Sequence, residues 1–150
     1  MSETLNDIAR AMVTPGKGIL AADESTATIK KRFDTINTES TADSRRDYRE
    51  MLFRTDEAMR SCISGVILYD ETIRQTAADG TPLVTLLQNA GSVPGIKVDT
   101  GAKDLAGFPG EKVTEGLDGL RDRLTEYYEL GARFAKWRGV ITIGDGRPST

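Results

Sequence analysis

GILAADE, at residues 18–24, is a run of five apolar or small residues that ends abruptly in two carboxylates. An apolar run without alternating polar positions is typical of a strand that is covered on both faces, as in a parallel sheet. Further runs of this kind follow at Ile63–Tyr69, Pro94–Val98 and Phe134–Ile143. The first run therefore predicts the opening strand of a parallel sheet, and the later runs predict its neighbours.

Amphipathic segments lie before and between these runs. Apolar residues recur at helical spacing in four places, which are Leu5–Met12, Tyr48–Thr55, Leu83–Ala90 and Leu117–Tyr127. Thr81–Pro82 reads as an N-cap followed by proline at the first helical position, and glycine follows the third and fourth segments as a C-cap. Helices alternating with apolar strands predict an α/β fold with right-handed crossovers and a parallel sheet.

Composition excludes several classes of function. The chain has 150 residues, a length typical of one domain, and no histidine. Without histidine, catalytic triads and nearly every zinc site are excluded, so we expect no metal and no cofactor. The net charge of −3 argues against a nucleic-acid partner. No apolar run approaches the ~18 residues of a membrane span, so we expect no membrane partner.

The single cysteine, Cys62, cannot form an internal disulfide, and the acidic start Met1–Thr4 lacks the apolar core of a secretory signal. Both features indicate a reducing, cytoplasmic compartment. Because Cys62 comes directly before an apolar run, we interpret it as a small core residue and not as a nucleophile.

Charged residues gather at the carboxyl ends of the predicted strands. Asp23 ends the first run, Lys97 and Asp99 share one side of the third, and Lys136 and Arg138 share one side of the fourth. Ligands of parallel α/β folds bind at these strand ends, and buried cations are costly unless an anion pairs with them. The pattern predicts a pocket for phosphate groups, in which Asp23 balances charge and moves protons.

Each of these residues also has a structural interpretation. Lys97 and Asp99 would form a structural ion pair, and Lys136 and Arg138 would lie on an exposed sheet edge. The hydroxyls of Ser25 and Thr28 would cap a helix, or hold a phosphate at its N-terminus. By composition alone, Arg32 and Arg45 are surface charges.

Several collinear segments are similar to class I fructose-bisphosphate aldolases. They are GKGILAADEST (16–26), ISGVIL (63–68), GIKVD (95–99), GLDGL (116–120) and FAKWR (134–138). The resemblance runs nearly the whole length of the chain but covers only the N-terminal part of the family's pattern. It implies a TIM (β/α)8 barrel of which residues 1–150 form the first four βα units, a single and incomplete domain.

The resemblance also implies an activity. Class I aldolases of glycolysis and gluconeogenesis reversibly cleave fructose 1,6-bisphosphate to dihydroxyacetone phosphate and glyceraldehyde 3-phosphate, through a lysine Schiff base and without a metal. A protonated imine acts as an electron sink when the C3–C4 bond breaks. The implied partner is a phosphorylated sugar, and the full-length enzymes of the family suggest a homotetramer.

Residues are carried over by motif. Asp23 resembles the carboxylate that assists proton transfer at the Schiff base, and Lys136 the lysine that assists carbinolamine dehydration. The resemblance implies substrate or phosphate contacts for six further residues, namely Ser25, Thr28, Arg32, Arg45, Lys97 and Arg138.

Two functions stay open at this stage. The family's Schiff-base lysine belongs on strand six and its general-acid glutamates on strand five, beyond the resemblance. We therefore expect the 150-residue chain to be a fragment that is inactive by itself. The alternative is a non-catalytic phosphosugar-binding or scaffold half-barrel. Another Schiff-base aldolase, such as a transaldolase, is disfavoured by the segments at 21–25 and 136–138.

Overall fold

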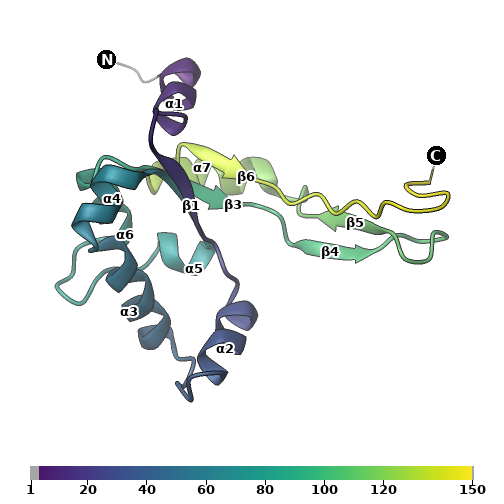
Figure 1. Ribbon diagram of the computed structural model, residues 1–150, viewed down its shortest axis with the longest axis horizontal. Helices are drawn as coiled ribbons and strands as arrows, with labels where there is room; N and C mark the ends of the chain where they lie inside the picture. The colour runs from purple at the N-terminus through teal and green to yellow at the C-terminus, as the bar shows by residue number, and fades with distance from the viewer. Residues whose placement is uncertain (1–3, 150) are drawn as a thin grey trace.

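A four-stranded parallel sheet lies at the centre of the computed structural model, which describes residues 4–149 (Figure 1). Its strands lie side by side in chain order, and they are β1 (Gly18–Ala22), β2 (Ile63–Leu68), β3 (Val93–Lys97) and β6 (Phe134–Lys136). The predicted parallel α/β fold is thus confirmed. Residues 1–3, which entered the argument about a secretory signal, and Thr150 lie outside the described residues.

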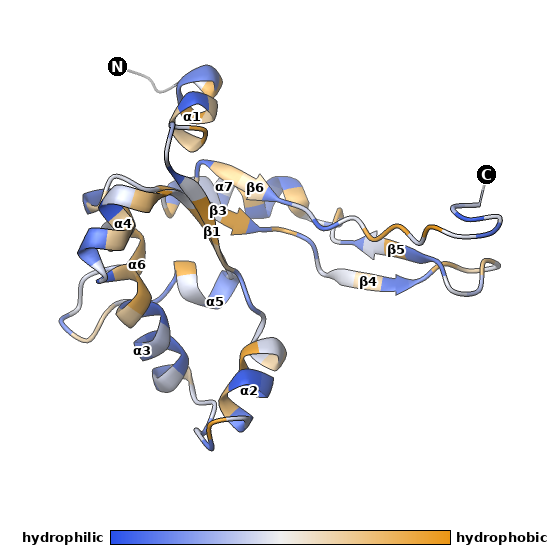
Figure 2. Cartoon of the chain, viewed as in Figure 1, coloured by the Kyte–Doolittle hydropathy of each residue, from blue (hydrophilic) through white to orange (hydrophobic). Residues whose placement is uncertain are grey.

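Helices precede, connect and flank the strands. They are α1 (Leu5–Met12), α2 (Thr26–Asp34), α3 (Ala42–Phe53), α4 (Asp56–Cys62), α5 (Asp70–Ile73), α6 (Leu83–Asn89) and α7 (Leu120–Glu129). α4 contacts β2 and α6 contacts β3. The core lies between the sheet and these helices, where Val66, Leu68 and Ile96 of the strands meet Leu83 and Leu87 of α6. Figure 2 shows hydrophobic residues on both sides of this core, in β1 and β3 of the sheet and in α6.

The fourth strand is shorter than predicted, because it ends at Lys136 and not at Ile143. Beyond it the chain leaves the sheet and runs beside a hairpin of β4 (Gly101–Asp104) and β5 (Lys112–Glu115). Side chains of the hairpin region hold this segment, since the Thr114 hydroxyl donates to the Arg138 carbonyl at 2.7 Å. Hairpin and C-terminal segment together form an arm that extends away from the sheet (Figure 1).

The helix predicted from the apolar residues at 48–55 is present as part of α3, and Leu52 packs against the core, but the rest of the buried face differs from the predicted stripe. Met51 is 60% exposed and Thr55 lies beyond the end of α3, whereas Arg49 and Phe53 are buried. The spacing of apolar residues does not identify a buried helix face when one of the buried residues is an arginine. Arg49 is tolerated there because its guanidinium donates to two backbone carbonyls and pairs with a carboxylate, so its charge is compensated.

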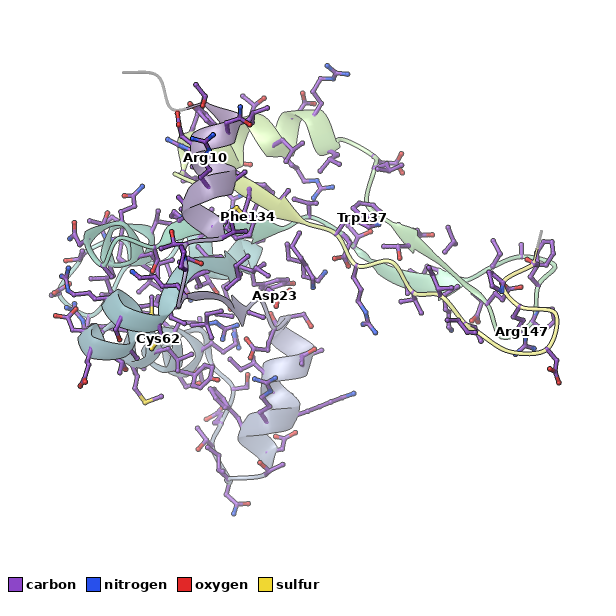
Figure 3. All side chains as sticks on the ribbon, turned by 45° about the horizontal axis from the view of Figure 1, so that its top comes forward. Arg10, Asp23, Cys62, Phe134, Trp137 and Arg147 are labelled. Carbon is purple, nitrogen blue, oxygen red and sulfur yellow. The ribbon has the colours of Figure 1, made fainter. Side chains whose placement is uncertain are left out.

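Two smaller expectations are also wrong. Cys62 is exposed at the end of α4, and Figure 3 shows it on the outer side of the molecule. It comes before the first buried residue of β2, so its side chain stays outside the core. At the start of α6, Pro82 is itself the cap residue and Leu83 is the first helical residue.

Phe134 covers two glycines on the sheet face opposite the helices. Gly95 is its partner in the register between β3 and β6, and Gly65 on β2 is the register partner of Val93, two residues before Gly95. A methyl group at Gly95 would fall well inside van der Waals contact with the Phe134 ring, and one at Gly65 would lie 3.3 Å from it. The two missing side chains therefore provide the space that the ring fills.

We expect Gly95→Ala to destabilise the fold by about 1–3 kcal/mol, because the added methyl group overpacks this site and displaces the Phe134 ring. Gly18→Ala on β1 is the control, since its methyl group would meet nothing within 4 Å and should change stability by less than about 0.5 kcal/mol. Urea unfolding of both variants measures the difference. Equal stability of the two would contradict this packing argument.

Candidate functional site

A cavity of about 610 Å³ lies at the carboxyl ends of all four parallel strands. Asp23 follows β1, Tyr69 follows β2, and Lys97 and Lys136 are the last residues of β3 and β6. All four line the cavity. The predicted gathering of charged residues at the strand ends is therefore present, at the edge where parallel α/β folds bind ligands.

Asp23 and Lys136 form an ion pair across the cavity, with Oδ2 and Nζ 2.7 Å apart. Only 12% of the Asp23 side chain is exposed. Because β1 and β6 are the two outer strands of the sheet, this contact joins residues from its opposite edges. In a flat sheet these strands would lie about 14 Å apart, so the contact favours a sheet that curves towards the cavity.

Lys97 is held by a residue two positions further along the chain. Its Nζ donates to the Asp99 carboxylate and to the Asp99 backbone carbonyl, both at 2.7 Å. Burial alone would raise the pKa of Asp99, but the hydrogen bond and charge of Lys97, the charge of Lys136 and a backbone hydrogen bond from Arg138 together outweigh burial and leave the pKa below the ordinary value. The structural ion pair considered above is present, and both partners also line the cavity.

Ser25 and Thr28 lie at the cavity wall and at the start of α2. Ser25 is the N-cap, since its hydroxyl accepts from the Thr28 backbone N–H at 3.4 Å and lies 3.0 Å from the Thr28 hydroxyl. The capping role is confirmed for Ser25. Both side chains line the cavity as well, so capping does not remove them from the site.

The last three predicted residues differ in position. Arg138 lines the cavity just beyond the end of β6. Arg32 and Arg45 do not line it, and both are engaged by glutamates. Arg32 pairs with Glu24, and Arg45 donates two hydrogen bonds to Glu71 at 2.6 and 2.8 Å. The structure brings Asp23, Ser25, Thr28, Lys97, Lys136 and Arg138 together, and leaves the two helical arginines outside the wall.

Sequence reasoning missed part of the wall that α7 supplies. Tyr127 is buried, and its hydroxyl donates to the Asp70 carboxylate at 2.9 Å. Arg123 donates to the Val98 carbonyl at 3.1 Å and to the Gly116 carbonyl at 2.5 Å. Asp70 itself is predicted at this edge, because it follows the second apolar run. No feature of the sequence marks Arg123 as part of the wall, because its hydrogen-bond partners are the backbone carbonyls of Val98 and Gly116.

Burial of the Tyr127 ring raises the pKa of its hydroxyl, and the hydrogen bond to Asp70 acts in the same direction. The hydroxyl is therefore a donor at neutral pH and fixes the orientation of Asp70 at the cavity wall.

Two other kinds of feature are absent from residues 4–149, the part of the chain that the structure describes. Within this range no group of three or more acidic or cysteine side chains is arranged to hold a metal ion. None of the helices described has the length and apolar character needed to cross a lipid bilayer.

Comparisons with known proteins agree with this geometry. The sequence profile of the glycolytic family described as fructose-bisphosphate aldolase class-I matches residues 4–150. A protein of Xanthomonas campestris pv. campestris, named probable fructose-bisphosphate aldolase class 1, is 60% identical over 147 residues, which are 98% of this chain and 44% of that protein. Fructose-bisphosphate aldolase 6, cytosolic, of Arabidopsis thaliana is 60% identical over 136 residues, or 91% of this chain and 38% of that protein.

A solved structure is similar as well. It is fructose-bisphosphate aldolase from Plasmodium falciparum, in complex with TRAP and a small-molecule inhibitor, with a TM-score of 0.90 and 51% identity. The match covers 95% of this chain and 41% of that one, so the chain spans less than half the length of the proteins it matches. From the profile match and these identities it follows that the chain belongs to the class I fructose-bisphosphate aldolase family.

Proposed function

We propose that this chain supplies the phosphosugar-binding and proton-transfer part of an aldolase active site. The reaction is the reversible cleavage of fructose 1,6-bisphosphate to dihydroxyacetone phosphate and glyceraldehyde 3-phosphate. The observation that carries the proposal is the Asp23–Lys136 pair at the strand ends, with Lys97 and Arg138 in the same cavity wall. A carboxylate and several cations around one cavity suit a doubly phosphorylated, hydroxyl-rich substrate.

We further propose that residues 1–150 are the N-terminal half of a (β/α)8 barrel. The four parallel strands lie in chain order, and the contact between Asp23 and Lys136 favours a curved sheet. Among the described residues, β1 and β6 each pair with a strand on one side only. A complete barrel takes about 250 residues, and the matched relatives are more than twice as long as this chain.

The cations of the wall would bind the phosphate and hydroxyl groups of the sugar. Lys97 is held by Asp99 at the end of β3, so its ammonium is fixed in place before a ligand arrives. Arg138 offers a planar guanidinium, which suits bidentate contact with a phosphate. The hydroxyls of Ser25 and Thr28 add donors at the first turn of α2.

Asp23 and Lys136 would move protons during catalysis. The carboxylate accepts a proton from a hydroxyl of the bound sugar, and the ammonium of Lys136 donates one to the hydroxyl that leaves as water when the carbinolamine becomes an imine. Imine formation needs a free amine. Lys97 and Lys136 each contact a carboxylate, so we assign the Schiff-base lysine to a strand outside these 150 residues.

The cytosolic name of the Arabidopsis relative supports a cytoplasmic location for this chain. The homotetramer stays a prediction.

Complementation tests the proposed activity. We expect no cleavage of fructose 1,6-bisphosphate by the 150-residue chain, and cleavage once it is assembled with the part of the Xanthomonas relative that follows its matched region. In this assembly Lys136→Met should lower kcat by about 10²–10⁴-fold, the usual contribution of a general acid or base. Coupled assay of glyceraldehyde 3-phosphate measures the rate.

Two outcomes would contradict this proposal. One is cleavage by the chain alone, with borohydride trapping dihydroxyacetone phosphate on Lys97 or Lys136. The other is an assembled pair that binds the sugar bisphosphate saturably but does not cleave it, which would favour a binding protein.

Binding of the sugar bisphosphate to the 150-residue chain tests the cationic wall separately. Lys97→Met should weaken binding by about tenfold or more, because a charge-assisted hydrogen bond contributes about 1.5–3 kcal/mol. Lys103→Met, at an exposed position of β4, is the matched control and should leave binding unchanged. Isothermal titration calorimetry gives both affinities, and equal losses in the two variants would indicate attraction by overall charge alone.

The same variant should change an acid titration. Without Lys97, the largest contributions that oppose burial are lost, so the pKa of Asp99 should rise from its position below the ordinary value of 3.8. The ion pair between Lys97 and Asp99 stabilises the fold fully above pH 3.8, and its contribution is lost as the pH falls through the lower pKa that Asp99 has in the folded state. The difference in free energy of unfolding between the parent chain and Lys97→Met should therefore become smaller in acid. Carboxyl ¹³C NMR follows Asp99, and Lys112→Met, which removes the partner of Asp104 in the hairpin, should leave Asp99 unaffected.

A further inference from the structure

Arg49 is a charged side chain that the proposed reaction does not use. It lies on α3, far from the strand ends in sequence, and only 2% of it is exposed. Its Nε donates to the Ala22 carbonyl at 2.9 Å, and its Nη2 donates to the Glu24 carbonyl at 3.2 Å. Nη2 also lies 2.8 Å from the Glu24 carboxylate.

The two carbonyls belong to the residues on either side of Asp23. One guanidinium therefore holds the backbone just before and just after the carboxylate that pairs with Lys136. We propose that Arg49 is a positioning residue, which fixes the turn between β1 and α2 so that the Asp23 carboxylate points at Lys136. The catalytic meaning of this role rests on the proposed function, but the geometry that it predicts does not.

Neighbouring contacts restrict the guanidinium further. Its Cζ lies 5.4 Å from the centre of the Tyr48 ring, and Glu24 is shared with Arg32 of α2. The planar fork of arginine donates along two fixed directions, whereas the ammonium of lysine is a single point charge. Lysine at this position would keep the charge but would not hold both carbonyls.

A purely structural role is the competing explanation, because a buried arginine that binds backbone carbonyls also ties α3 to the sheet. The two roles differ in one observable. A structural role lowers stability and leaves the Asp23–Lys136 pair intact, whereas a positioning role breaks or loosens that pair while the fold persists.

Carboxyl ¹³C NMR of the 150-residue chain at neutral pH separates the two roles. Lys136→Met defines the displacement of the Asp23 resonance when the pair is lost. We expect Arg49→Lys to displace the resonance in the same direction by at least half that amount, and Lys136→Met added to Arg49→Lys to contribute only the remainder, because both act on one contact. Arg46→Lys, on the same helix but bound to Asp43 and Asp47, is the matched control and should not displace it.

An unchanged Asp23 resonance in a folded Arg49→Lys variant, or a full further displacement on adding Lys136→Met, would overturn the proposal. If Arg49→Lys does not fold, hydrogen exchange of the arginine Nε–H groups in the unsubstituted chain decides. The Arg49 Nε proton should exchange at least tenfold more slowly than that of Arg46. Equal rates would contradict the hydrogen bond from Arg49 Nε to the Ala22 carbonyl, and with it the proposal.

These outcomes do not depend on a ligand. Absence of fructose 1,6-bisphosphate binding would remove the proposed function and leave the positioning of Asp23 intact, so the two failures are distinguishable.

Discussion

The ion pair between Asp23 and Lys136 is the contact on which the candidate site depends, because it joins the two outer strands of the sheet over the ends of the inner ones. Both groups lose part of their hydration when they pair. Removal of one partner would leave the other poorly compensated, which is costly at a site where the Asp23 side chain is mostly buried. The curvature of the sheet and the positions of Asp23 and Lys136 at its carboxyl edge therefore depend on the same contact.

Carboxylates hold most of the cations near this rim. Lys97 is paired with Asp99, Arg45 with Glu71, and Arg49 and Arg32 with Glu24. Such a network fixes the side chains before a ligand binds, so less conformational entropy is lost on binding. It also means that a phosphate competes with carboxylates already present.

The sequence was informative wherever one residue type in one position had a single physical explanation. Unbroken apolar runs located all four parallel strands, and the charged residues at their ends located the part of the cavity wall that the strand ends supply. The sequence was not informative for side chains whose hydrogen-bond partners are backbone atoms far away along the chain. Nothing in the sequence marks Arg49 as buried, because the carbonyls that compensate its charge belong to residues 22 and 24. The end of β6 was missed for a similar reason, since the hairpin draws the following residues away from the sheet.

The Phe134 ring and the two glycines beneath it have a consequence for how this sequence is able to vary. Each position is limited by the size of the others, because the ring occupies the space of two absent side chains. A smaller residue at 134 would permit alanine at 95, whereas a larger one at either glycine requires a compensating loss at 134. The side-chain sizes that these three positions tolerate therefore depend on one another. Lys136, the last residue of β6, lies two residues after Phe134, so the packing of the ring also restricts where the Lys136 ammonium lies.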